Sequence, residues 1–475
     1  MSAPDSANET IAAISTPPGR GGIGIVRLSG PQAASIAVQL VRLHSPLAHA
    51  RARLAEVLDG EGDEAERIDE ALVTYFAAPH SYTAEDLVEI AAHGSPVVLD
   101  LLLRRAIDCG ARLAEPGEFT QRAFLAGRLD LTQAEAVRAL IEAQTLTQAR
   151  QAASQMGGAL SRRVAPVKQA LVELIVLLEA GIDFAEDDVE VTPAREIAGR
   201  IDALTPPLLA LEASFARGRV VQDGLTLAIV GRPNAGKSSL FNRLVERDRA
   251  IVTATPGTTR DLVTERISLG GIPLEIVDTA GLRTGREEAE QLGIARSREA
   301  LADAALALVV LDATEPLNTE EERLLDSVRG RPAIVAINKA DLLPPSIWPV
   351  AQSPRAEPAF AATFAETSAL NGLAVLATSA LTGEGIAALR ERILALATGG
   401  AAAEPGLLTN LRQHQAVGTA LAALGDAASA NTNGIPHEMI LIDLYRALWA
   451  LDSLTGQTTP DDILASIFST FCIGK

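Results

Sequence analysis

The chain has 475 residues, 48% of them hydrophobic, and a formal net charge of −19; this length predicts about two to four domains, and the acidic balance repels nucleic acid on average. No apolar run reaches the roughly 18 residues of a membrane span, the polar amino terminus lacks a secretion signal, and only two cysteines, Cys109 and Cys472, occur. These features argue against a membrane span and a disulfide framework. We expect a cytoplasmic protein in which any RNA contact needs a local arginine patch or a basic partner.

The amino-terminal region combines strand and helix signals. The predicted strands are residues 10–14, 24–28, 71–76 and 87–91. Pro96–Asp108 predicts a helix. Residues 19–24 match Gly-x-Gly-x-x-Gly, but a dinucleotide site needs a helix directly after that pattern. Because residues 25–28 continue as a strand, we interpret these glycines as a turn.

Two helical stretches flank a region of alternating strands and helices. Residues 131–178 have apolar side chains at helical spacing, and helices are predicted through residue 218. The helical pattern returns at residue 407, after a small-residue linker at 399–405. Each stretch has an apolar face that must be covered. The simplest solution packs the two on each other as one discontinuous helical domain with the α/β region inserted; two separate small bundles are the alternative.

The α/β region opens with a phosphate-binding motif. Residues 231–238 read Gly-x4-Gly-Lys-Ser, between a predicted strand at 225–230 and a helix that begins near Lys237. Backbone amides of such a loop and the positive end of the helix surround phosphate. Lys237 adds a charge on the β- and γ-phosphates, and the Ser238 hydroxyl can bind Mg²⁺. Only four lysines occur in the chain, and Lys237 and Lys339 both fall in nucleotide motifs.

A polar loop and three further motifs follow in the order expected of a guanine-nucleotide site. In the polar loop 253–261, Thr259 can give Mg²⁺ a second hydroxyl, and Asp278 can approach the ion through water. Gly281 can offer its amide to the γ-phosphate. Asn338-Lys339-Ala340-Asp341 predicts guanine selection, because the Asp341 carboxylate can accept from guanine N1–H and the exocyclic amine. Ser379-Ala380 completes the base pocket.

The residue after Gly281 is Leu282, where many GTPases have a water-positioning glutamine. Leucine cannot orient water, so hydrolysis needs another residue or a partner. The charged stretch 286–290 could supply one, or could be a solvated helix face. The chain ends with Phe471-Cys472-Ile473-Gly474-Lys475, which either docks a terminal helix in a core or delivers Cys472 or Lys475 to a site.

Taken together, these motifs resemble the MnmE (TrmE) family of tRNA modification GTPases over essentially the full length of the chain. The segments that carry the resemblance are residues 16–24, 116–119, 123–125, 231–238, 257–261, 278–283 and 471–475. The resemblance implies a multidomain α+β and α/β fold. Its parts are an α/β folate-binding and dimerisation domain at 1–122, a discontinuous all-α helical domain at 123–218 and 399–475, and an inserted Ras-like P-loop GTPase domain at 219–398.

The resemblance also assigns site residues. Residues expected to contact GTP are Asn234, Ala235, Gly236, Lys237, Ser238, Ser239, Thr253, Ala254, Thr255, Pro256, Gly257, Thr258, Thr259, Asp278, Thr279, Ala280, Gly281, Asn338, Lys339, Asp341, Ser379, Ala380 and Leu381. Implied K⁺ ligands are Asn234, Thr253, Thr255 and Thr258, while Ser238 and Thr259 bind Mg²⁺. Glu290 and Asn234 are the implied catalytic residues. Implied folate contacts are Arg27, Glu89, Arg128 and Lys475.

The implied function is a K⁺-stimulated GTPase that works with an FAD- and NADH-dependent partner of the MnmG (GidA) family. Together they would add an aminomethyl-type (carboxymethylaminomethyl) group to carbon 5 of the wobble uridine of tRNAs. Implied cofactors are GTP, Mg²⁺, K⁺ and 5-formyltetrahydrofolate or 5,10-methylenetetrahydrofolate, and the implied assembly is a homodimer within a heterotetramer or larger complex. Two alternatives stay open: a ribosome-assembly GTPase acting as an RNA-binding switch, and a folate-binding aminomethyl carrier in which GTP is structural.

Overall fold

The structure is a computed structural model that describes residues 9–60, 65–183, 192–245, 263–278, 301–343, 370, 372–400, 406–456, 464 and 467–474, with only the main chain described at 183, 263, 264 and 278. The chain divides into two compact units. Unit 1 comprises Met1–Arg138, Gln155–Ile201 and Thr419–Lys475, and unit 2 comprises Ala139–Ser154 and Asp202–Gly418. None of the described helices is both long enough and apolar enough to cross a bilayer.

Unit 1 contains a seven-stranded sheet in the order β3-β4-β5-β6-β2-β1-β7. The strands are β1 Ile11–Ile14, β2 Gly21–Ser29, β3 Val41–Leu43, β4 Arg51–Asp59, β5 Glu66–Phe76, β6 Leu87–Gly94 and β7 Arg112–Leu113. Neighbours are antiparallel except for the parallel pair β1 and β7. Helices α1 (Ala33–Leu40) and α2 (Pro96–Asp108) pack on alternate side chains of these strands, including Val26, Val73 and Ile90.

The four strands predicted in this region lie within β1, β2, β5 and β6, and the predicted helix is α2. β2 starts inside the glycine turn and continues to Ser29, so a strand and not a helix follows the glycines, which confirms that the pattern is not a dinucleotide site. The prediction missed α1, β3, β4, β7 and α3 (Glu118–Leu125). β4 mixes charged and apolar residues, and only its pairing with β5 identifies it as a strand.

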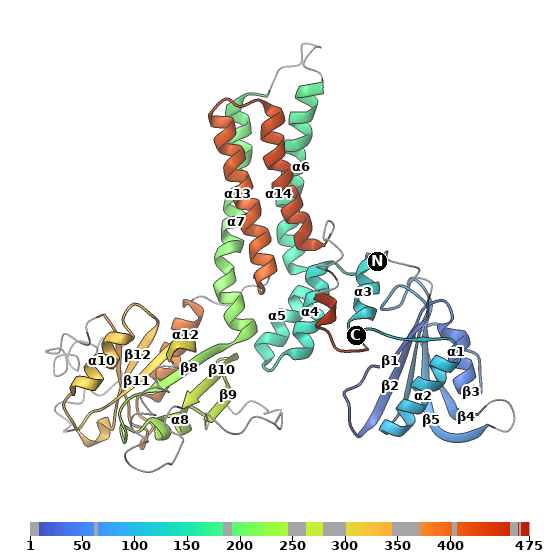
Figure 1. Cartoon of the computed structure of the whole chain (residues 1–475), viewed down its shortest axis with the longest axis horizontal. Coiled ribbons are helices and arrows are strands. Elements are labelled where there is room, and N and C mark those ends of the chain that lie inside the picture. Colours follow the sequence, from blue (N-terminus) through green and yellow to red (C-terminus); the bar gives the residue numbers. More distant parts are fainter. Residues whose placement is uncertain are drawn as a thin grey trace. The chain divides into compact units, whose positions relative to one another are not determined.

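Helices from the middle and the end of the chain share contacts in unit 1. The long helices are α4 Leu131–Glu142, α5 Leu146–Met156, α6 Ala159–Asp183, α7 Ala194–Asp223, α13 Leu411–Thr432 and α14 His437–Thr455. Of these, α6 and α14 lie wholly in unit 1. α14 lies beside α6 (Figure 1), where Lys168 pairs with Asp452 at 2.5 Å. The Tyr445 hydroxyl donates to Glu179 at 2.6 Å. This arrangement confirms the predicted discontinuous helical domain and removes the alternative of two separate bundles; the domain boundaries stay predictions.

Unit 2 contains a six-stranded sheet in the order β13-β12-β11-β8-β10-β9, parallel except for β9. The strands are β8 Leu225–Val230, β9 Val263–Leu269, β10 Ile272–Asp278, β11 Leu306–Asp312, β12 Ala333–Asn338 and β13 Ala374–Ala377. Its helices include α8 Lys237–Val245, α10 Thr319–Ser327 and α12 Ile386–Thr398. Leu227 and Ala228 of β8 face different apolar clusters, so the sheet is buried on both faces, as in doubly wound α/β folds. The predicted α/β insertion is therefore confirmed.

Candidate functional site

The carboxyl ends of the parallel strands in unit 2 carry the sequence motifs. β8 leads into Gly231, β10 ends at Asp278 and β12 ends at Asn338. β13 ends at Ala377, just before Ser379. The carboxyl ends of parallel strands meet at one edge, and β8 lies between β11 and β10, where the strand order changes direction. Ligands of α/β sheets bind at such a switch point.

The phosphate-binding loop needs glycine at two positions. Gly231 has φ +149°, and a Cβ there would lie 2.2 Å from the Val310 carbonyl oxygen. Gly236 has φ +90°, and a Cβ there would lie 2.1 Å from Nδ2 of Asn338. Any larger residue would push the loop away from the sheet, so these glycines allow the close approach on which the loop depends.

α8 begins at Lys237, directly after the loop, so the amino end of the helix faces the loop. The Lys237 side chain is 7% exposed, and its ammonium donates to the carbonyl oxygens of Gly231 at 2.7 Å and Arg232 at 2.8 Å. Asn234 has φ +65° and is exposed. Ser238 and Ser239 are exposed on the first turn of α8, whereas Ala235 is buried.

Asn338 joins the phosphate loop to the base-recognition segment. Its side chain is 1% exposed. Nδ2 donates to the Ala235 carbonyl at 3.0 Å, and Oδ1 accepts from the Ala380 amide at 3.0 Å. An apolar residue here would leave both main-chain groups without this partner. The asparagine of the predicted base motif therefore holds the phosphate loop and the segment after β13 together.

The segment that follows β13 is held by α8. Arg243 donates from Nε to the Ala380 carbonyl at 2.8 Å and from Nη2 to the Leu381 carbonyl at 2.7 Å. Ser379 is fully buried, and its Oγ accepts from the Thr382 amide at 3.0 Å. Because these bonds fix the main chain, the exposed Leu381 side chain projects from a defined loop.

Two members of the site were not found from the sequence. Asp312 ends β11 and accepts from the Lys339 ammonium at 2.7 Å. Burial raises the pKa of this carboxyl, but hydrogen bonds from Lys339 and Thr314 hold it below its ordinary value. Arg243 is the other. An acidic residue directly after an apolar run was the available signal for Asp312; Arg243 gave none, because its partners lie far away in the sequence.

A second candidate site lies in unit 1. Arg27 of β2 and Glu89 of β6 are register partners, and the guanidinium donates to Glu89 from Nη2 at 2.7 Å and from Nε at 3.0 Å. Arg27 Nη1 also donates to the Gly474 carbonyl at 3.3 Å, and the Ser15 hydroxyl donates to the same oxygen at 3.1 Å. The structure therefore brings two predicted folate contacts to the carboxyl-terminal segment.

Aromatic rings border this arginine. The Arg27 guanidinium carbon lies 5.8 Å from the centre of the Tyr82 ring and 5.5 Å from that of Phe119. Burial raises the pKa of Tyr82, while a hydrogen bond with Thr120 and the charges of Arg27 and Arg128 oppose that rise. Arg128 is a third predicted folate contact, and its charge acts on the same hydroxyl.

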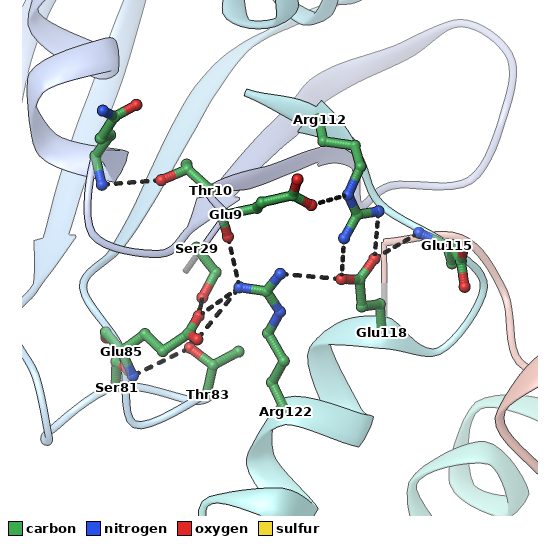
Figure 2. Close-up of polar contacts among 11 residues, drawn as sticks. Glu9, Thr10, Ser29, Ser81, Thr83, Glu85, Arg112, Glu115, Glu118 and Arg122 are labelled. Atoms are coloured by element: carbon green, nitrogen blue, oxygen red, sulfur yellow. Dashed lines mark hydrogen bonds and ion pairs between the residues drawn. The ribbon is translucent and has the colours of Figure 1, made fainter. Parts of the chain in front are cut away.

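A buried ion network fixes α3 beside this region (Figure 2). Glu118 is 6% exposed and accepts from Arg112 at 2.6 Å and from Arg122 at 3.0 Å. Arg122 also pairs with Glu85 at 3.0 Å and donates to the Glu9 carbonyl at 2.9 Å. Because each buried charge has an opposite charge and a hydrogen bond, the network avoids the cost of an unpaired ion.

The amino end of α3 meets the end of the chain. Gly117 donates its amide to the Cys472 carbonyl at 3.4 Å. Phe468 and Phe471 are buried in a cluster with Leu131, while Cys472 is exposed. The terminal segment is thus docked in a core, one of the two interpretations of its sequence, and the same segment delivers the Gly474 carbonyl to Arg27.

Several predicted site residues lie outside the described part of the chain. They are Thr253, Ala254, Thr255, Pro256, Gly257, Thr258, Thr259, Thr279, Ala280, Gly281, Glu290 and Lys475. Asp278 is described only in its main chain, at the end of β10. Asp341 is half-buried in the short 3-10 helix Ala340–Leu342 that follows Lys339.

Comparison with known proteins covers nearly the whole chain. A family model described as "MnmE helical domain" matches residues 131–472, and one described as "GTP-binding protein TrmE N-terminus" matches residues 10–128. The tRNA modification GTPase MnmE of Koribacter versatilis is 56% identical, over 98% of this chain and 99% of the relative. That of Chloroflexus aurantiacus is 42% identical, over 98% of this chain and 100% of the relative.

Among solved structures, the G domain of the T. maritima FeoB iron transporter is 25% identical, with a TM-score of 0.25. The match covers 36% of this chain and 98% of that one. At such a score the likeness carries no inference about this chain.

Proposed function

Because the chain belongs to the MnmE family of tRNA modification GTPases, we propose that its GTP hydrolysis helps to install an aminomethyl-type (carboxymethylaminomethyl) group at carbon 5 of the wobble uridine of tRNAs. Hydrolysis of GTP in tRNA modification is the activity of the family. The finer proposal adds a folate one-carbon unit, stimulation by K⁺, a homodimer, and a partner protein of the MnmG family that uses FAD and NADH. The tRNA is the substrate of the joint reaction.

The observation that carries the folate proposal is the meeting of Arg27, Glu89 and the chain end. Folates have a flat, hydrogen-bonding pterin ring and a glutamate tail. Glu89 offers carboxylate oxygens that can accept from pterin N–H groups, and the cations Arg27 and Arg128 can attract the tail carboxylates. The rings of Tyr82 and Phe119 supply apolar surface beside them. Lys475 follows Gly474, whose carbonyl Arg27 binds, and we assign its ammonium to the same ligand.

The nucleotide proposal assigns a role to each motif. Lys237 and the amides of the phosphate loop bind the phosphates, and the exposed Ser238 hydroxyl binds Mg²⁺ with Thr259. Lys339 and Asp341 select guanine. An ion at the β- and γ-phosphates supplies charge that stabilises the transferring phosphoryl group.

We assign potassium stimulation to the amide oxygen of Asn234, together with loop oxygens from Thr253, Thr255 and Thr258. The support in this chain is that Asn234 lies exposed at the loop, in a left-handed conformation, with its side chain available to a cation. Glu290 would orient the attacking water, the task that Leu282 cannot perform. Two protomers that meet through these loops would exclude water from the reacting phosphate.

The proposed stimulation by K⁺ is tested by measuring GTP turnover in KCl and in NaCl at equal ionic strength. We expect faster turnover in KCl, by about 10-fold or more, since one transition-state cation is worth several kcal/mol. The matched variant is Asn234→Ala, which should lose the difference between the salts. Equal rates in both salts would overturn the K⁺ assignment.

The folate half is tested by equilibrium binding of 5-formyltetrahydrofolate. We expect Arg27→Ala to weaken binding about 10-fold or more, because the variant removes a charge and the bond to Gly474. Arg42, an exposed arginine of the same sheet that pairs with Glu56 at 3.2 Å, provides the control Arg42→Ala, which should bind normally. No binding by the wild-type chain would overturn the folate assignment. The two full-length relatives described above are named as tRNA modification GTPases, which favours this proposal over the ribosome-assembly alternative.

A further inference from the structure

We propose that Asp312 is a positioning residue for guanine recognition, holding Lys339 in the conformation that receives the base and tying it to the phosphate loop through Arg232. This deepens the proposed base-recognition role of Lys339 and rests on it. Asp312 has no predicted contact with nucleotide, so any effect it has on binding must act through its neighbours.

Both oxygens of the Asp312 carboxylate accept hydrogen bonds from defined groups. The side chain is 4% exposed. Oδ1 accepts from the Thr314 amide at 2.9 Å and from the Thr314 hydroxyl at 2.6 Å, and Oδ2 accepts from the Lys339 ammonium at 2.7 Å. The two bonds from Thr314 fix the orientation of the carboxylate. Oδ2 is therefore presented to Lys339 in one direction, rather than as a mobile surface charge.

Lys339 is the residue that the Asp312 carboxylate can hold in place. Its backbone is left-handed, with φ +61°, and its side chain is 33% exposed, so part of its length remains accessible to a ligand. A free lysine loses much rotamer freedom when it is fixed against a bound base. An ion pair that already fixes the ammonium lowers that loss, because the side chain is ordered before the base arrives.

Arg232 connects the Asp312 carboxylate to the phosphate loop. It follows Gly231 directly, and its guanidinium contacts three carboxylates, one at the end of β11, one on the loop that follows and one on α10. They are Glu315 at 2.8 Å, Glu321 at 3.4 Å and Asp312 at 3.9 Å. Glu321 is itself fixed, because it forms the capping box at the start of α10 with Asn318. One buried carboxylate thus lies between a cation of the phosphate loop and a cation of the base motif.

The test is the affinity of the full chain for GDP and for inosine diphosphate, which lacks the exocyclic amine. We expect Asp312→Asn to weaken both by the same factor, about tenfold, because ordering of Lys339 serves any purine. The KM for GTP should rise by a similar factor, while kcat falls less than about twofold. An unchanged affinity, or a loss confined to GDP, would overturn the inference.

A double-mutant cycle separates this inference from its premise. In a Lys339→Met background, Asp312→Asn should cause less than about a twofold further loss, because the group that it positions is gone and the remaining contact with Arg232, at 3.9 Å, is beyond hydrogen-bond distance. If Lys339→Met leaves GDP affinity unchanged, the base-recognition role of Lys339 fails. If Lys339→Met weakens binding but Asp312→Asn does not, only the role of Asp312 fails.

Asp326→Asn is the control for the loss of one negative charge in the same unit. Asp326 of α10 is 66% exposed and pairs at 3.1 Å with Arg329, which lies just after the helix, so GDP affinity should not change. If Asp312→Asn fails to fold, Asp312→Glu keeps the charge but displaces the oxygen that Lys339 binds. That variant should weaken GDP and inosine diphosphate equally, and normal affinity would contradict the proposal.

Discussion

At the residue scale, the ion network of unit 1 shows how a buried carboxylate can keep its charge. The pKa of Glu118 is raised by burial, but bonds from Arg112, from the Glu115 amide and from Arg122 together hold it below its ordinary value of 4.5. A carboxyl whose pKa is lower in the folded state adds stability that is fully present above its unfolded pKa. That stability disappears as the pH falls through the folded value.

We therefore predict that Glu118→Gln lowers the unfolding free energy at neutral pH by about 2 kcal/mol, less than a fully broken buried pair because Arg122 keeps Glu85. The deficit should shrink below about pH 4.5, where the wild-type carboxyl also becomes protonated. Urea unfolding of both chains at neutral and acid pH measures this. The control Glu70→Gln removes a half-exposed partner of Arg67 and should change little; a pH-independent deficit for Glu118→Gln would contradict the prediction.

At the element scale, the start of α3 and the terminal segment fit only because Gly117 has no side chain. Gly117 has φ +70°, and a Cβ there would lie 2.6 Å from the Phe468 carbonyl oxygen. Gly127 has the same φ of +70° but nothing within 4 Å of a built Cβ. The chain thus offers two glycines with equal backbone strain, of which only one faces the terminal segment.

We predict that Gly117→Ala loosens residues 467–474 and speeds their amide hydrogen exchange by about tenfold or more, because the added methyl cannot share space with the Phe468 main chain. Gly127→Ala should incur only the left-handed backbone cost of about 1 kcal/mol and leave that exchange unchanged. Hydrogen exchange of the carboxyl-terminal peptide measures both. Equal protection from hydrogen exchange in the two variants would show that Gly117 does not fix the position of residues 467–474.

At the element scale it is also clear which features of the structure the sequence predicts and which it does not. Glycines 231 and 236, Lys237 and Asn338 were predicted because each motif is contiguous and its order is fixed by strand topology. The roles of Gly117 and Asp312 were not, since they depend on partners far away in the sequence. β4 was missed because its side-chain pattern is ambiguous until a neighbouring strand pairs with it.

At the scale of the whole molecule, distant parts of the chain complete one core while the nucleotide motifs lie in the other unit. Leu464, Phe468 and Phe471 pack with Leu131 and Ala134 in unit 1. The phosphate loop and the base motif belong to unit 2. The end of the chain should therefore support the fold of unit 1 without supporting nucleotide binding.

We predict that Phe468→Ala destabilises unit 1 by about 3–5 kcal/mol, the usual loss for a large aromatic side chain that is 2% exposed. The affinity for GDP should stay within about twofold of wild type, because no described member of the nucleotide site lies in that core. Calorimetry with and without GDP separates the unfolding of the two units. Only the transition whose midpoint temperature GDP does not raise should shift in the variant. Ile473→Ala, at a residue 52% exposed, is the control and should shift neither transition. A loss of GDP affinity in Phe468→Ala that matches its loss of stability would mean that the two units fold as one, and that the terminal segment supports the nucleotide site as well as its own core.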